Sequence, residues 1–232
     1  MKILFDYSIF FHQTLGGISR YYISLYEEFL KKNQETKILA PLHSNIFLKN
    51  SNYKSNLNMY IKKYPKYSRK LIKSYNQIFS KLYYNYYKPD IIHKTFYENN
   101  LNKKSKSKNI LTVMDLIHEI YYEDYGFDKN FKHKAASLEN LDYIICISKK
   151  TKLDLLNFYN LPEKKVEVVY LGVKKFNAIV HEKVQIIDTP YVLYVGDRKK
   201  YKHPKSLRAS HGSNNWSCSR GLHTIKKSCW FK

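Results

Sequence analysis

Three polar side chains follow one apolar run closely enough to act on a common ligand. Asp115, His118 and Glu119 come within five residues after 110–114 (ILTVM), a run that we expect to form a buried strand. Carboxylate and imidazole groups at a strand end can bind hydroxyl groups or act as acid and base. The alternative is a loop of solvated residues that caps a helix. Metal-ligating partners at a suitable spacing are missing for His118 and Glu119, so a metal site is disfavoured.

A glycine pair, Gly16 and Gly17, lies between the strand predicted at 2–5 and the first predicted helix. Glycine lets backbone N–H groups approach a ligand closely, and the start of a helix attracts an anion. The spacing does not match G-x-G-x-x-G, so the fingerprint of a dinucleotide site is absent. A tight turn without a ligand is the alternative for this pair.

Two further positions carry side chains suited to a ligand. His93 ends the strand predicted at 91–93, where it could contact a ligand or serve as a satisfied structural group. Arg198 and Lys202 follow the strand predicted at 191–195, and two cations in that place suit a diphosphate, whose charge they would neutralise. Solvated surface charge is the alternative for this pair.

The elements expected to position these residues alternate between strands and helices. Apolar runs predict strands at 2–5, 37–40, 91–93, 110–114, 142–147, 166–171 and 191–195. Helical spacing of apolar residues predicts helices at 18–30, 68–87, 129–140 and 149–158. This alternation favours a Rossmann-like α/β fold, in which a parallel sheet has helices on both faces. Ligands of such sheets bind at the carboxyl ends of the strands, where the candidate residues also fall.

Length and composition limit the classes of protein to which the chain can belong. The chain has 232 residues and a formal charge of +22, and 44% of its residues are hydrophobic, which argues for a buried core and against disorder. No apolar run reaches the roughly 18 residues of a membrane-spanning helix. Asp6 and His12 interrupt the apolar start of the chain, which argues against a signal peptide. Three cysteines without a C-x-x-C spacing argue against a disulfide scaffold, so we expect a cytoplasmic protein.

The last 30 residues differ in composition from the rest of the chain. Residues 203–232 contain six of the 41 basic residues, none of the 19 acidic residues and none of the 23 tyrosines, but both tryptophans. The contents of acidic residues, tyrosine and tryptophan all change at the same point, which favours a shift of the reading frame near residue 203. A disordered basic tail is the alternative.

Five segments together resemble glycosyltransferase family four, whose members have the two-domain GT-B fold. These segments are GGISRYYISL (16–25), DIIHKTFYE (90–98), ILTVMDLIHE (110–119), LDYIICISKKTKLDLLNFYNLPEKKVEVVYLGV (141–173) and YVLYVGDRKKYKH (191–203). The fourth segment is the most specific, because it spans a whole helix–strand unit. The most similar subgroup is the mannosyltransferase-like enzymes of surface polysaccharide assembly.

The resemblance implies a division of the chain into domains. Residues 1–173 would form the acceptor-side Rossmann-like domain, 174–189 a linker, and 190–202 the first strand and phosphate loop of an incomplete donor-binding domain. The resemblance places Gly16, Gly17, Arg198 and Lys202 at the donor phosphates, and His93, Asp115, His118 and Glu119 on the acceptor side.

The activity implied by the resemblance is transfer of a sugar from a nucleotide-sugar to a saccharide or lipid-linked acceptor. The subgroup points to mannose, and enzymes of this fold usually need neither a metal nor another cofactor. Two departures matter. Met114 stands where many relatives have a histidine, and about 150 further residues, the size of one domain, would be needed to complete the donor side. We therefore expect this chain by itself to be inactive as a transferase, because half of a cleft cannot exclude water from the donor.

Nucleic-acid binding is the alternative function, since a basic chain with 16% aromatic residues suits single strands. One observation argues against it. The aromatic residues of the helix predicted at 68–87 fall partly on an apolar face that we expect to pack in the core, Leu71, Tyr75, Ile78, Leu82 and Tyr86. No nucleic acid is therefore expected as a partner.

Attachment to a membrane surface is compatible with the transferase hypothesis. Basic residues gather in and before the same helix, Lys62, Lys63, Lys66, Arg69, Lys70 and Lys73. They could hold the chain peripherally at the inner face of a membrane by contact with anionic lipid. A solvated helix face is the alternative.

Overall fold

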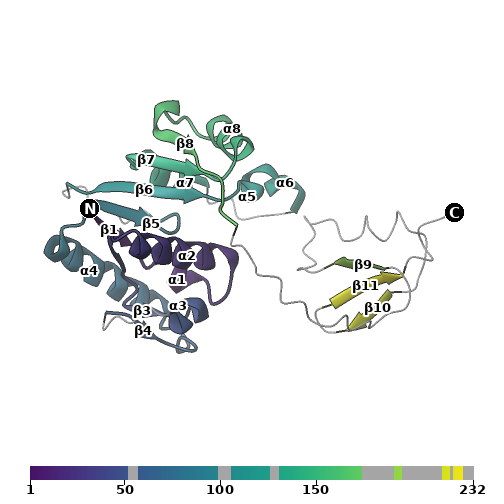
Figure 1. Ribbon diagram of the computed structural model, residues 1–232, viewed down its shortest axis with the longest axis horizontal. Coiled ribbons are helices and arrows are strands. Elements are labelled where there is room, and N and C mark those ends of the chain that lie inside the picture. The colour runs from purple at the N-terminus through teal and green to yellow at the C-terminus, as the bar shows by residue number, and fades with distance from the viewer. Residues whose placement is uncertain are drawn as a thin grey trace. The chain divides into compact units, whose positions relative to one another are not determined.

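The computed structural model describes residues 1–51, 57–98, 106–125, 131–173, 191–194, 216–219 and 222–226. The chain forms two compact units, one of residues 1–120 with 128–171 and one of residues 121–127 with 172–232 (Figure 1). The linker predicted at 174–189 and the phosphate loop predicted up to residue 202 lie outside the described residues.

A six-stranded parallel sheet forms the centre of the first unit. Its strands are β1 (Lys2–Phe5), β2 (Glu35–Ile38), β5 (Ile91–Lys94), β6 (Lys108–Val113), β7 (Tyr143–Cys146) and β8 (Val166–Val168). They are hydrogen-bonded in the order β2-β1-β5-β6-β7-β8, and every neighbouring pair is parallel. The predicted Rossmann-like α/β fold is therefore confirmed.

Most predicted strands differ by one to three residues at their ends, as β2 and β8 illustrate. β2 begins two residues earlier than predicted, because Glu35 pairs with Lys2 at the edge of the sheet, although Glu35 itself is exposed. β8 ends at Val168 rather than at residue 171. Val169 N still donates to the Cys146 carbonyl at 3.0 Å, but the following residues are exposed beside the last strand of the sheet.

Helices cover both faces of this sheet. On one face, Ile3 and Phe5 of β1 pack with Tyr22 of α2 (Gly17–Lys31). Leu4, which points to the other face, packs with Tyr84 of α4 (Arg69–Tyr87). The strand register puts Leu111 on the same face as Leu4. There it joins a cluster with α7 (Phe131–Glu139) and α8 (Lys149–Phe158). Alternation along each strand thus determines which helix covers which residue.

The apolar face predicted for α4 is not the face that packs in the core. Leu71, Tyr75, Ile78, Leu82 and Tyr86 are exposed, whereas Ile72, Asn76, Ser80, Tyr83, Tyr84 and Tyr87 are buried. A polar contact helps to fix this orientation. The Asn76 carboxamide accepts from Leu42 N and donates to the Leu42 carbonyl, both at 2.9 Å. The prediction was wrong because the helix has apolar residues on both sides, and tyrosines occupy the buried one.

Several short elements lie between the main ones. They are α1 (Ser8–His12), β3 (Leu42–His43), α3 (Ile46–Asn50), β4 (Met59–Tyr60), α5 (Ile117–Ile120) and a 3₁₀ turn (Glu163–Lys165). β3 and β4 pair in parallel as a separate two-stranded sheet. α3 falls in a segment for which no helix was predicted, and it begins where the Asn45 side chain accepts from Leu48 N at 2.9 Å.

The second unit contains α6 (Tyr122–Tyr125) and an antiparallel sheet in the order β10-β11-β9. β9 (Tyr191–Tyr194) is the strand predicted at 191–195, and it pairs with β11 (Leu222–Lys226), which also pairs with β10 (Trp216–Ser219). β10 and β11 lie in the segment 203–232. The division of this unit into a donor domain fragment and a tail stays a prediction.

Candidate functional site

The strand order creates a point at which the chain reverses direction across the sheet. From β1 the chain passes to β2 on one side, and it then returns past β1 to β5 on the other side. In open parallel sheets, ligands bind outside the carboxyl ends of the two strands at such a point. Asp6 follows β1 and Thr95 follows β5, so these residues mark that position.

Asp6 joins the ends of the two strands. Its carboxylate is 1% exposed and accepts from Thr95 N at 2.8 Å through Oδ1 and from the Ser8 hydroxyl at 2.9 Å through Oδ2. The ammonium group of Lys94, also buried, lies 3.9 Å from Oδ2. Burial lowers the pKa of Lys94, and the charges of Asp6 and Glu98 oppose that effect. Asp6 therefore holds two loops and one buried cation at the predicted ligand edge.

Glu98 lies in the same region and has three polar partners. The Tyr7 hydroxyl donates to Oε2 at 2.9 Å, while His12 Nε2 and Lys73 Nζ lie 2.6 Å and 3.0 Å from Oε1. Burial raises the pKa of this carboxyl group, but the hydrogen bonds from His12, Lys73 and Tyr7 outweigh it and lower the pKa to about 2. Glu98 is therefore ionised at neutral pH.

The glycine pair lies at the start of α2 and the two residues have different surroundings. A Cβ atom on Gly16 would lie 2.2 Å from the carboxamide of Gln13, whereas one on Gly17 would meet nothing within 4 Å. The Gln13 oxygen accepts from Ser19 N at 3.0 Å, so this side chain caps the helix. The backbone is open at Gly17 and filled by Gln13 at Gly16. Contact with donor phosphates stays a prediction for both.

His93 lies inside the protein, beneath α2. Its ring centroid is 5.2 Å from those of Phe5 and Tyr22, and Nε2 lies 3.0 Å from the Thr112 hydroxyl. Burial lowers its pKa to about 3, so the imidazole is neutral at pH 7. With 2% exposure, His93 can support an acceptor site only through the side chains that it contacts.

The three residues after β6 do not share one environment. Asp115 and His118 are exposed, and Asp115 Oδ1 accepts from Ile117 N at 3.2 Å at the start of α5. Glu119 is 2% exposed, accepts from the Tyr159 hydroxyl at 2.9 Å and forms an ion pair with Lys134. The structure thus leaves two side chains accessible to an acceptor and turns the third inward.

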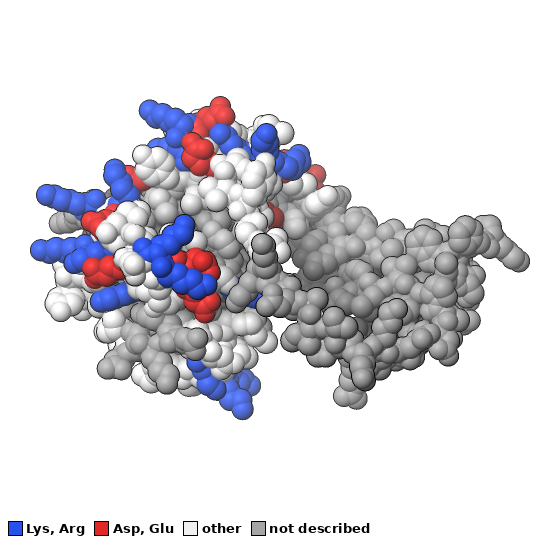
Figure 2. All heavy atoms as spheres, in the orientation of Figure 1, with Lys and Arg blue, Asp and Glu red and all other residues white. Residues whose placement is uncertain are grey.

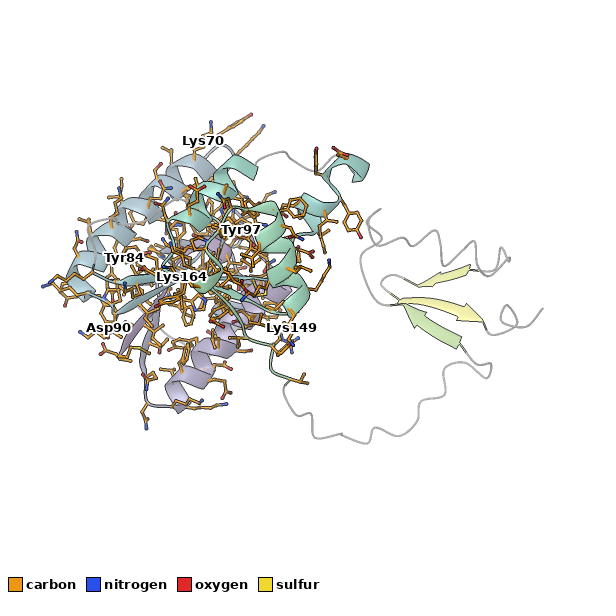
Figure 3. The ribbon with its side chains drawn as sticks, turned by 90° about the horizontal axis from the view of Figure 1, so that it is seen from above. Lys70, Tyr84, Asp90, Tyr97, Lys149 and Lys164 are labelled. Atoms are coloured by element: carbon orange, nitrogen blue, oxygen red, sulfur yellow. The ribbon has the colours of Figure 1, made fainter. Side chains whose placement is uncertain are left out.

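The surroundings of Glu119 form a small buried cluster. The Lys134 ammonium lies 4.1 Å from the centroid of the Tyr97 ring, a residue that Figure 3 labels within the first unit. Burial lowers the pKa of Lys134, and Glu119 opposes that effect. Burial also raises the pKa of Tyr159, as does the charge of Glu119. Glu119 Oε2 is buried and accepts no hydrogen bond from any residue that the structure describes.

Sequence reasoning missed Asp6, Glu98 and Lys134. The position of Asp6 directly after the first strand was an available signal, of the same kind that singled out Asp115. Glu98 and Lys134 had no such signal, because their partners are distant in sequence. Arg198 and Lys202 lie outside the described residues. Within the described part, no three His, Cys, Asp or Glu side chains form a group that could hold a metal ion.

Comparison with known proteins gives three findings. No curated protein matches this chain. Among solved structures, the chain is similar to the apo form of the lipopolysaccharide outer core galactosyltransferase WaaB, with 18% identity and a TM-score of 0.44 over 75% of this chain. It spans 46% of the length of that structure. The model of Glycosyltransferase Family 4 matches residues 15–175, most of the first unit, and the chain therefore belongs to glycosyltransferase family 4.

Proposed function

We propose that this chain is the acceptor-side part of a nucleotide-sugar glycosyltransferase. The observation that carries the proposal is the family match over residues 15–175, which covers β2, β5, β6, β7 and β8 of the parallel sheet. The polar residues at the carboxyl ends of these strands support it, because ligands of parallel sheets bind at this edge. The acceptor would be a saccharide or a lipid-linked saccharide.

The reaction forms one bond and breaks another at the anomeric carbon of the donor sugar. An acceptor hydroxyl forms the new glycosidic bond and loses its proton, and the bond to the nucleotide diphosphate breaks. In the proposal, the exposed Asp115 and His118 bind or deprotonate the acceptor hydroxyl. Gly17, at the start of α2, offers open backbone to the leaving diphosphate. Arg198 and Lys202 would add two cations to that diphosphate.

The buried candidates take supporting roles in this proposal. Glu119 would hold the segment after β6 in place through its contacts with Tyr159 and Lys134. His93 would pack beneath α2 and so help to place the Gly16–Gly17 loop. Neither side chain has an exposed surface with which to contact a sugar.

The finer features of the activity rest on the resemblance described for the sequence. The proposed reaction is transfer of mannose from a guanosine diphosphate carrier in surface polysaccharide synthesis. Galactose is the alternative sugar, since the similar solved structure is named a galactosyltransferase. We propose a cytoplasmic location, peripheral at the inner face of a membrane. No described helix is both long and apolar enough to cross one. We also propose that the 232 residues alone do not catalyse transfer.

The encoding DNA provides the test. If the two other reading frames downstream of codon 203 encode a donor-binding domain, the restored chain should transfer mannose or galactose to a saccharide acceptor, and the 232-residue chain should not. In the restored chain, Asp115→Asn and His118→Ala should lower turnover by about a hundredfold. Glu163→Gln, an exposed change on another element, is the matched control and should leave turnover unchanged. Absence of transfer and of nucleotide-sugar binding by the restored chain would overturn the proposal.

A further inference from the structure

The outer surface of α4 carries a row of large apolar side chains that are exposed. Leu71, Tyr75, Ile78, Leu82 and Tyr86, here called the α4 stripe, are 75%, 48%, 61%, 65% and 83% exposed. Their spacing of three or four residues puts them on one side of the helix over four turns. Single exposed apolar residues are ordinary, but a continuous row of five indicates an interaction surface.

The α4 stripe is a stable feature of the fold, because the opposite side of the helix is fixed. Tyr84 and Tyr87 are buried against β1 and β5, and Asn76 makes two hydrogen bonds with the backbone of Leu42. Turning the helix to bury the stripe would break those bonds and expose the tyrosines. The stripe therefore faces outward as a consequence of core packing.

Basic residues lie beside the stripe, and the sequence around it contains no acidic residue. Residues 36–89 contain eleven Lys or Arg and no Asp or Glu. Lys70 and Lys81 lie along one flank of the stripe and are exposed, and Figure 3 labels Lys70 near the start of α4. Red acidic side chains lie among the blue basic ones over much of the face drawn in Figure 2.

We propose that the α4 stripe and its flanking lysines bind the surface of an anionic lipid bilayer. Apolar side chains with exposed tyrosines suit the boundary between head groups and acyl chains, and lysines beside them suit anionic head groups. The helix of 19 residues is about 28 Å long, which gives a flat contact parallel to the membrane plane. The absence of acid from 36–89 favours an anionic lipid surface over an ordinary protein partner, which would offer charges of both signs.

Co-flotation of the full 232-residue chain with lipid vesicles tests the proposal. Vesicles of phosphatidylcholine alone are compared with vesicles containing 30% phosphatidylglycerol, on the order of the anionic content that gives a membrane its surface potential. The chain should float with the anionic vesicles and stay at the bottom with the neutral ones. Raising the salt concentration should weaken binding, because the lysine contribution is screened. The measurement needs no sugar donor, so its failure would leave the proposed transferase function untouched.

Variants identify the surface. Leu71→Ser with Ile78→Ser and Leu82→Ser should lower vesicle binding by about tenfold or more. The control, Leu153→Ser with Phe158→Ser, changes apolar residues of α8 that are also about half exposed, and it should bind like the original chain. Lys70→Glu with Lys81→Glu should also lower binding by at least tenfold. The control Lys149→Glu with Lys164→Glu changes two lysines that Figure 3 places apart from Lys70, and it should have a smaller effect.

Three results would overturn the proposal. They are equal flotation with neutral and anionic vesicles, equal loss of binding in the stripe variant and its α8 control, and a dimer without lipid that the stripe substitutions abolish. The dimer would assign the stripe to a second copy of this chain. Circular dichroism should show unchanged helix content in every variant. If the serine variant fails that check, the two lysine variants decide the outcome by themselves.

Discussion

Two buried carboxylate clusters lie at the carboxyl edge of the same sheet, and they are built differently. In the first, Asp6 and Glu98 connect the ends of β1 and β5, and Glu98 reaches the surface through the partly exposed His12 and Lys73. In the second, Glu119 pairs with Lys134 and Tyr159, and its Oε2 atom has no hydrogen-bond donor within the described part of the chain. The carboxylates of the first cluster therefore hold the loops together through hydrogen bonds. The second cluster, near the proposed acceptor residues, keeps one carboxylate oxygen without a hydrogen bond from the described residues.

Removal of Asp6 should have the largest effect on stability. Asp6→Ala leaves Lys94 buried without its nearest carboxylate and leaves Thr95 N without its acceptor. We expect the free energy of unfolding to fall by about 3–5 kcal/mol, measured by urea denaturation. Asp6→Asn keeps one acceptor and should cost less. A loss below about 1 kcal/mol for Asp6→Ala would show that the first cluster does not hold the sheet edge.

The ionised Glu98 carboxylate should have the next largest effect on stability, and this effect should depend on pH. Because folding lowers this pKa from 4.5 to about 2, the bonds to His12, Lys73 and Tyr7 stabilise the fold above pH 4.5, and their contribution disappears as the pH falls through about 2. Comparison of the original chain with Glu98→Gln should show a difference of about 3 kcal/mol at pH 6 that closes near pH 2. A difference independent of pH would show that the ionised Glu98 carboxylate does not stabilise the fold.

The second cluster should respond to loss of its cation. Lys134→Met removes the cation from the buried Glu119 carboxylate and leaves the hydrogen bond from the Tyr159 hydroxyl in place. We expect a loss of about 2–3 kcal/mol in chemical unfolding at pH 7. The double variant Lys134→Met with Glu119→Gln should recover part of that loss, because no uncompensated charge remains. No recovery would mean that the two residues do not form the expected pair.

Removal of one tyrosine hydroxyl from each cluster should have the smallest effects on stability, and it compares the two clusters directly. Tyr159→Phe removes the hydroxyl that Glu119 shares with its Lys134 ion pair, whereas Tyr7→Phe leaves Glu98 its contacts with both His12 and Lys73. We expect losses of about 2 kcal/mol and about 1 kcal/mol respectively in thermal unfolding. The reverse order would show that Glu119 is better satisfied than its contacts indicate.

The sequence was sufficient for the fold because the relevant signals are local. Apolar runs and helical spacing predicted each strand of the parallel sheet and its four main helices, with errors of a few residues at the ends. The incorrect prediction of which face of α4 is buried shows the limit of such signals. Leucine and isoleucine marked one side of that helix, but contacts with strands formed elsewhere in the sequence selected the tyrosine side.

The site was predicted less completely, because burial depends on distant contacts. His93 and Glu119 follow or end strands as active residues often do, yet α2 covers one and Tyr159 and Lys134 enclose the other. Glu98 has partners that lie 86 and 91 positions away in the sequence. No local pattern can show which polar residues will meet over that separation.

Sugar transfer by the chain with its reading frame restored beyond residue 203 tests the central claim most directly. The restored chain should turn over a nucleotide-sugar with a saccharide acceptor and lose that turnover in Asp115→Asn, whereas the 232-residue chain should show no turnover above a blank. Turnover by the 232-residue chain alone would contradict the claim that it is one half of the enzyme. A restored chain that neither binds nor turns over any nucleotide-sugar would contradict the claim that it is a transferase.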